Sequence, residues 1–95
     1  MNFLFKPVFQ KAFAGLDQDK QRLVLKALEA LEAHFQGGTA SYGLRVKKLH
    51  QGKSAGVFEA RVSSDLRMVW VKTEDKVILA QLGNHEDVRR FLKSF

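Results

Sequence analysis

Within residues 56–84 the sequence reads GVFEARVSSDLRMVWVKTEDKVILAQLGN, and the strands predicted in this segment establish the fold class. Apolar and charged residues alternate over residues 57–62, which predicts a half-buried strand with Glu59 and Arg61 together on its outer face. A Ser-Ser-Asp turn follows, and residues 66–72 are rich in β-forming residues, so we expect them to pair antiparallel with the first strand. The two segments together predict a β-hairpin.

A third strand and a terminal helix follow this hairpin. Residues 77–82 are almost continuously apolar, which predicts a strand that is covered on both faces and lies inside the sheet. Gly83 and Asn84 end this strand. In the segment after Asn84, acidic residues come early and basic residues come late, an order that suits the dipole of a short C-terminal helix.

The N-terminal half reads as a strand followed by two helices. Residues 1–5 form a short strand or extended arm, and Pro7 favours a first helical position because it loses no hydrogen bond there. Asp17 is placed to cap a second helix over residues 18–36, where apolar residues recur at spacings of three and four. Gly37 ends this helix, since glycine permits the left-handed turn at a helix C-terminus.

These elements predict a single α+β domain over residues 1–95. Two N-terminal helices pack on one face of a small antiparallel sheet, and a short helix ends the chain. The glycine-rich residues 37–56 are interpreted as a mobile connection. Trp70 is assigned to the core, as is a stripe of phenylalanines. The stripe consists of Phe3, Phe5, Phe9, Phe13 and Phe35.

The composition points to a basic protein of a reducing compartment. The 95 residues include 16 Lys and Arg but 10 Asp and Glu, and the formal net charge of +6 favours anionic partners. The chain has no cysteine, so it lacks a disulfide framework and a cysteine nucleophile, and the cytoplasm is the expected location. Lys6 and Pro7 interrupt the apolar start, so neither a signal peptide nor a membrane span is expected.

The positive charge is concentrated in the C-terminal half. A segment without acidic residues contains Arg45, Lys47, Lys48, His50 and Lys53. A basic segment beside a sheet is suited to bind RNA phosphates, because each neutralised phosphate releases counterions. The alternative is a solvated run of charges that keeps a small protein soluble. Composition does not separate these two interpretations.

Four side chains could carry acid–base chemistry at one edge of the sheet. Glu59 and Arg61 share a strand face, an antiparallel partner brings Arg67 within reach of it, and His85 directly follows the last strand. A carboxylate, two guanidinium groups and an imidazole support metal-free transfer at a phosphodiester. RNA is the natural substrate, because its 2′-hydroxyl is an internal nucleophile.

Three of these four residues also have a simpler explanation. Glu59 and Arg61 match an ordinary cross-strand ion pair on a protein surface, worth about 0.2–1 kcal/mol. His85 matches a histidine that bonds local backbone at the start of a helix. No cofactor is expected, because the sequence has no glycine-rich phosphate loop and its three histidines are too far apart to suggest a metal site.

The C-terminal half resembles toxins of the RelE/ParE superfamily. The resemblance rests on residues 56–62, residues 66–71 and residues 77–88, the last of which read VILAQLGNHEDV. In that family a strand–helix–helix leader precedes three antiparallel strands with charged residues, and a Gly-x-His or Gly-x-Arg element follows the last strand. The N-terminal half fits this order as well, so the resemblance implies the same fold.

The resemblance also implies residue roles. Glu59 would be the general base, Arg61 a second charged residue on the same strand, and Arg67 the arginine that opens the middle strand. His85 would be the acid or the stabiliser of the leaving group. Many members place a catalytic tyrosine in the terminal helix, and this chain has none there. In that helix Arg89 and Arg90 would stabilise charge or bind RNA, and the basic segment 45–53 would grip RNA or the ribosome.

The function implied by the resemblance is that of a toxin in a type II toxin–antitoxin pair. Such toxins are usually metal-independent endoribonucleases that cut mRNA, often on the ribosome, and a cognate antitoxin holds them inactive. The chain would be a monomer alone and part of a higher-order complex with its antitoxin. Two alternatives stay open: a ParE-like toxin that binds DNA gyrase without catalysis, and a basic module that binds RNA or the ribosome. The carboxylate and the imidazole favour the nuclease.

Overall fold

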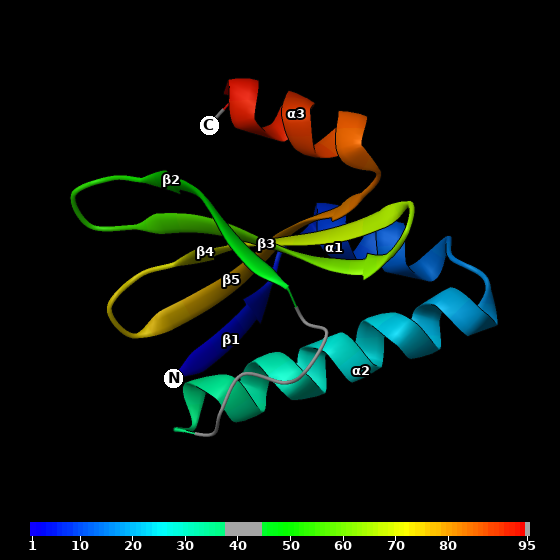
Figure 1. The fold of residues 1–95 in the computed structure, drawn as a ribbon, viewed down its shortest axis with the longest axis horizontal. Coiled ribbons are helices and arrows are strands. Elements are labelled where there is room, and N and C mark those ends of the chain that lie inside the picture. Colours follow the sequence, from blue (N-terminus) through cyan, green and yellow to red (C-terminus); the bar gives the residue numbers. More distant parts are fainter. Residues whose placement is uncertain (38–44, 95) are drawn as a thin grey trace.

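The computed structural model describes residues 1–37 and 45–94, and within these ranges the chain forms three helices and one five-stranded sheet (Figure 1). The strands are β1 (Asn2–Phe5), β2 (Val46–Gln51), β3 (Gly56–Ser63), β4 (Leu66–Lys72) and β5 (Lys76–Gly83). The helices are α1 (Pro7–Ala14), α2 (Gln18–Phe35) and α3 (His85–Ser94). The α+β class is therefore confirmed, with the leader and the terminal helix in the predicted order.

The sheet is larger than predicted, and it is mixed. Its strand order is β1-β5-β4-β3-β2. The hairpins β2–β3, β3–β4 and β4–β5 are antiparallel, whereas β1 pairs parallel with β5, with Asn2 opposite Lys76. The expectation of a purely antiparallel sheet was wrong because four residues at a chain end carry no local signal for the strand they join. As predicted, β5 is an interior strand, with partners on both sides.

The strand β2 was not predicted. It occupies residues 46–51 within the segment that the sequence suggested was a mobile connection, and residues 38–44 of that segment lie outside the described residues. β2 is an edge strand that contains Lys47 and Lys48. Edge strands often carry lysines, which discourage pairing with further strands, and they need not bury a regular apolar face. The usual alternation of apolar residues is therefore weak here.

The predicted helix boundaries agree with the structure. Pro7 is the first residue of α1, and the Asp17 carboxylate caps α2 by accepting a hydrogen bond from the backbone N–H of Lys20 at 2.8 Å. After α2, Gly37 has a φ of 93°, the left-handed conformation expected beyond a helix C-terminus. None of the helices in the described ranges combines the length and apolar content that a membrane-spanning helix needs.

The helices form layers on both faces of the sheet (Figure 1). On one face, which we call the α1/α2 face, Phe9, Val24 and Leu31 pack against Met68 and Trp70 in the main core. On the other face, which we call the α3 face, a smaller core joins Val88 of α3 to valines of β3 and β4. The middle of the sheet is thus covered on both sides, and β3 and β4 direct alternate side chains into one core or the other.

The predicted aromatic core is confirmed except at Phe5. Phe9 and Trp70 are buried, and Phe3, Phe13 and Phe35 are partly buried against the main core. Phe5 is 41% exposed instead, and it lines an apolar cavity of about 340 Å³ between α1 and α2. As the last residue of β1, Phe5 lies where the chain turns from the sheet into α1, and a strand pattern does not predict burial at such a corner.

Candidate functional site

The site is built around an ion pair between neighbouring strands. Nε of Arg67 in β4 lies 3.6 Å from Oε2 of Glu59 in β3. The two residues are diagonal neighbours, because Glu59 is the Cα partner of Val69, two residues beyond Arg67. The alternation of the hairpin therefore does what the sequence predicted: it directs both charges to one face of the sheet.

This ion pair is far less exposed than the sequence suggested. The side chain of Glu59 is only 15% exposed and that of Arg67 only 16% exposed. Val57 and Val69, on the same face, are fully buried beneath Val88 of α3. The prediction that Glu59 lies on an outer face of its strand was wrong, because no local sequence pattern shows that α3 packs over this face.

Two cross-strand rows describe the surroundings of the pair. Lys47, Glu59, Val69 and Gln81 are successive Cα partners from β2 to β5. The second row runs from Arg61 through Arg67 to Gly83. Cα partners direct their side chains to the same face, so the two rows place Lys47, Arg61 and Gln81 on the α3 face with the Glu59–Arg67 pair.

Sequence reasoning missed one member of these rows. Gln81 is a polar residue in the otherwise apolar run of β5, and it is half-buried on the α3 face. Its side-chain oxygen accepts a hydrogen bond from the backbone N–H of Leu82 at 3.0 Å. A single amide inside an apolar strand was the signal that could have identified this position.

His85 lies at the end of the second row. It is the first residue of α3, two residues after Gly83, the Cα partner of Arg67. His85 is exposed. Since α3 packs on the face that holds Glu59 and Arg67, His85 begins a helix on that same side of the sheet, at the end where Gly83 pairs with Arg67.

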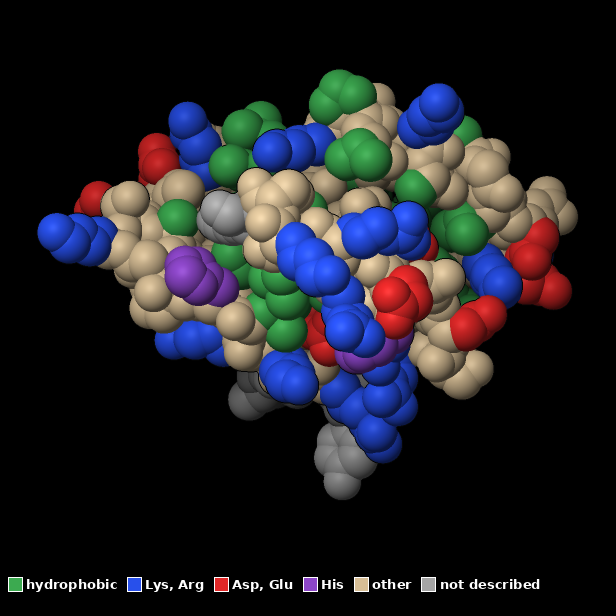
Figure 2. Space-filling view, turned by 90° about the horizontal axis from the view of Figure 1, so that it is seen from above, with side chains coloured by type: hydrophobic (Ala, Val, Ile, Leu, Met, Phe, Trp, Pro, Cys, Tyr) green, Lys and Arg blue, Asp and Glu red, His purple; other side chains and the backbone are tan. Residues whose placement is uncertain are grey.

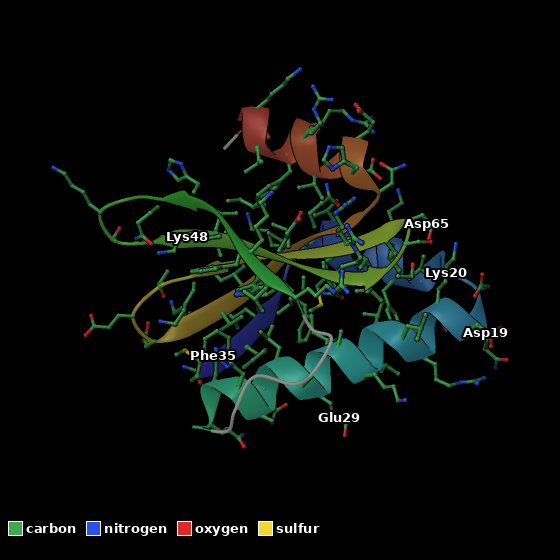
Figure 3. The ribbon with its side chains drawn as sticks, in the orientation of Figure 1. Asp19, Lys20, Glu29, Phe35, Lys48 and Asp65 are labelled. Atoms are coloured by element: carbon green, nitrogen blue, oxygen red, sulfur yellow. The ribbon has the colours of Figure 1, made fainter. Side chains whose placement is uncertain are left out.

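The predicted basic segment does not form a single surface. Lys47 shares the α3 face with Glu59, whereas Lys48 extends from the opposite face, where its Nζ lies 5.7 Å from the centre of the Phe58 ring (Figure 3). Arg45 precedes β2 with a φ of 47° and is exposed. His50 is the Cα partner of Val57, after an irregularity in the pairing of β2.

Lys53 and the two arginines of α3 have other surroundings. Lys53 belongs to the β2–β3 turn and lines a polar cavity of about 640 Å³ between that turn and the β4–β5 turn, at the far end of β3 from Arg61. Arg89 contacts Glu86 at 3.2 Å, and Arg90 contacts Asp87 at 2.7 Å. These arginines therefore neutralise carboxylates of their own helix in this conformation.

The α3 side of the molecule is nevertheless strongly basic. Figure 2 looks onto this side and shows lysine and arginine side chains gathered near its middle, with a few carboxylates and a histidine among them. Such a surface favours a polyanion, and the half-buried carboxylate at its base could accept a proton. Among the described residues, no group of three or more His, Cys, Asp or Glu side chains is arranged to hold a metal ion.

Comparison with known proteins gives matches to solved structures alone. The sequence matches no protein-family model and no curated protein. The archaeal RelE–RelB complex of Pyrococcus horikoshii matches with a TM-score of 0.72 at 18% identity, covering 87% of this chain and 92% of that one.

Two bacterial structures match in the same way. The YoeB dimer of Staphylococcus aureus gives a TM-score of 0.67 at 20% identity, covering 90% of this chain and 97% of that one. A metal-bound toxin from Helicobacter pylori gives 0.66 at 18% identity, covering 93% and 98%. These likenesses extend over nearly the whole chain, and from them we conclude that it has the fold of the RelE and YoeB toxins.

Proposed function

We propose that this protein is the toxin of a type II toxin–antitoxin pair and that it cuts mRNA without a metal ion. The proposal depends on one observation above all: a half-buried carboxylate, Glu59, lies 3.6 Å from an arginine on a basic face. The shared fold with RelE and YoeB supports it. An acid–base reaction at a phosphate needs a carboxylate that accepts a proton and nearby cations that stabilise the negative charge.

The reaction assigns one step to each group. The carboxylate of Glu59 takes the proton from the ribose 2′-hydroxyl, and the 2′-oxygen attacks the adjacent phosphorus. The bond from phosphorus to the 5′-oxygen breaks, and protonated His85 gives its proton to that oxygen. Arg61 and Arg67 offset the negative charge that grows on the phosphate oxygens. The products are a 2′,3′-cyclic phosphate and a 5′-hydroxyl end.

The remaining cations fit a role in binding. Lys47 in β2 is the Cα partner of Glu59 in β3, so it can contact the RNA backbone next to the scissile bond. Arg45, Lys48, His50 and Lys53 are more distant contacts for RNA or for the ribosome. Arg89 and Arg90 are available to RNA only if it competes with Glu86 and Asp87 for them.

A cognate antitoxin is the proposed protein partner. Two of the similar structures are complexes of this kind, RelE with RelB and YoeB with YefM. An antitoxin with an acidic segment would complement the net charge of +6. Co-expression with the product of a short adjacent acidic gene should yield a complex that purifies as one species, and separate elution of the two proteins would contradict the pairing.

The low exposure of Glu59 favours a second function, in which the toxin acts by binding alone. In that case the Glu59–Arg67 pair is a structural ion pair, and the basic face binds DNA gyrase or the ribosome without chemistry. Such a protein would leave transcripts whole, so the two functions differ in what happens to RNA.

The experiment that separates them is expression of the chain alone, followed by mapping of RNA ends and by incubation of the purified protein with RNA. A nuclease should produce new 5′-hydroxyl ends within coding sequences, either on free RNA or on translating ribosomes. RNA with a single 2′-deoxyribose at the cleavage position should stay intact. Whole transcripts together with DNA breaks would refute the nuclease and favour gyrase as the target.

A further inference from the structure

The first turn of α3 lies directly against the last residue of β5. A Cβ atom added to Gly83 would lie 2.7 Å from Cβ and 2.8 Å from Cγ of Asp87, closer than real Cβ atoms approach their neighbours. The absent side chain of Gly83 is therefore what allows Asp87 to approach the sheet this closely.

Asp87 is held against Gly83 by a set of short polar contacts. Its Oδ2 accepts a hydrogen bond from the backbone N–H of Asn84 at 2.9 Å, and its own N–H donates to Oδ1 of Asn84 at 2.9 Å. Its other carboxylate oxygen, Oδ1, accepts from Nη2 of Arg90 at 2.7 Å. Asn84 and Asp87 thus form a reciprocal cap at the start of α3, in the manner of a capping box.

This contact lies between the residues proposed for catalysis. Gly83 is the Cα partner of Arg67, Arg67 contacts Glu59, and His85 stands between the two capping residues. We propose that Asp87 is a positioning residue: by fitting against Gly83 it fixes the height of the first turn of α3, and so of His85, above the Glu59–Arg67 pair. This inference rests on the proposed nuclease function.

The inference gives Arg90 a role different from the one that the sequence suggested. Its guanidinium holds the Asp87 carboxylate from the solvent side, so Arg90 supports the cap. Arg89 has no such connection to Gly83, because its partner is the exposed Glu86. Glu86 and Asp87 therefore form a matched pair: they are adjacent acids, each bonded to an arginine three residues later, and only Asp87 contacts the sheet end.

The first test compares the Asp87→Ala, Asp87→Asn and Glu86→Ala variants in steady-state cleavage, which gives kcat and KM, and in RNA binding. Misplacement of a reacting group by about 1 Å costs roughly 100-fold in rate, so Asp87→Ala should lower kcat at least about tenfold without raising KM, since it also frees Arg90 for RNA. Asp87→Asn should keep most of the activity, since its carboxamide oxygen still caps Asn84. Glu86→Ala should keep the kcat of the parent, and any change should be confined to RNA affinity, since it frees Arg89. A kcat for Asp87→Ala equal to that of the parent, or an equal loss in Glu86→Ala, would overturn the inference.

The second test uses the Gly83→Ala variant, whose methyl group should push the first turn of α3 outward. Cleavage should fall, and the loss in the Gly83→Ala/Asp87→Gly double variant should be smaller than the product of the losses in Gly83→Ala and Asp87→Gly, because both substitutions break the same contact. If the loss of activity in the double variant equals the product of the two single losses, the proposed contact between Gly83 and Asp87 does not affect cleavage.

A third measurement does not depend on nuclease activity. The N–H of Val88 bonds to the carbonyl of Asn84 at 3.1 Å, so hydrogen exchange at Val88 reports on the first turn of α3. Exchange should accelerate in Asp87→Ala and Gly83→Ala but not in Glu86→Ala, and unchanged exchange in both would refute the positioning role. If the parent protein cuts no RNA in any setting, the proposed function fails, while the exchange data still test the contact.

Discussion

Lys47 and Lys48 are neighbours in the sequence but extend from opposite faces of β2. Lys47 is the Cα partner of Glu59 on the α3 face, and Lys48 is the partner of Phe58 on the α1/α2 face. There, Nζ of Lys48 lies over the Phe58 ring, which stacks on Trp70 with a centroid distance of 6.0 Å. Two adjacent lysines that the sequence suggested belong to one basic segment therefore lie on two different surfaces, the α3 face and the α1/α2 face.

This separation predicts unequal effects of two similar substitutions. Lys47→Ala should weaken RNA binding and lower the slope of log K against log salt concentration by about 1, the loss of one phosphate contact. Lys48→Ala is the matched comparison and should change both values less, because Lys48 extends from the face opposite Glu59. Fluorescence anisotropy with labelled RNA at several salt concentrations measures both. Equal losses in the two variants would mean that RNA does not approach from the α3 face.

Much of the fold could be predicted because its signals are local. The alternation in β3, the Asp17 cap and the glycine after α2 each depend on a few adjacent residues. The parallel pairing of β1 with β5 could not be predicted in this way, since it joins Asn2 to Lys76 across most of the chain. The edge strand β2 was missed because it has few apolar residues to alternate.

In the candidate site, too, the features that depend on local sequence could be predicted and those that depend on tertiary contacts could not. Alternation and hairpin pairing were enough to predict that Glu59 and Arg67 lie close together. Their low exposure depends on α3 folding back over β3 and β4, a tertiary contact that involves Val88 and no local motif. The contact between Gly83 and Asp87 was likewise invisible, because a glycine after a strand ordinarily indicates only that the strand ends.

The link between α2 and the β3–β4 turn should make stability depend on pH. A hydrogen bond from Ser63, at 2.9 Å, and the charge of Lys20, at 3.5 Å, lower the pKa of Asp65 from its ordinary value (Figure 3). A carboxylate with a lowered pKa stabilises the fold above its ordinary pKa, and this contribution is lost as the pH falls through the lowered value. Asp65→Asn should therefore reduce Tm at neutral pH, and the difference from the parent should shrink in acid.

Ser63→Ala supplies the control for this prediction. It removes the hydrogen bond to Asp65 and leaves Lys20 in place, so its pH-dependent loss should be smaller than that of Asp65→Asn. Thermal unfolding from pH 7 to below about 3.9, the ordinary pKa of aspartate, measures both. A Tm difference between parent and Asp65→Asn that stays constant over this range would rule out the linkage.

Removal of Arg67 should reduce stability as well as activity. Arg67→Ala would leave the 15%-exposed carboxylate of Glu59 without the arginine that it contacts. An unpaired, largely buried polar group costs about 1–3 kcal/mol, so the free energy of unfolding should fall by that order in urea titrations. Arg61→Ala is the control, because Arg61 is exposed and a surface substitution usually changes stability by less than about 0.5 kcal/mol. Equal stability of the two variants would mean that the ion pair contributes nothing to the fold.

The proton acceptor itself can be tested without disturbing the fold. Glu59→Gln keeps the size of the side chain and an oxygen that can accept from Arg67, but a carboxamide cannot take the proton of the 2′-hydroxyl. Loss of a general base typically costs about 100- to 10,000-fold in rate, so cleavage should fall by that order with unchanged RNA affinity. Glu74→Gln, in the exposed β4–β5 turn, should cleave like the parent. Full activity of Glu59→Gln would remove Glu59 as the base and leave Arg67 and Glu59 as a structural ion pair.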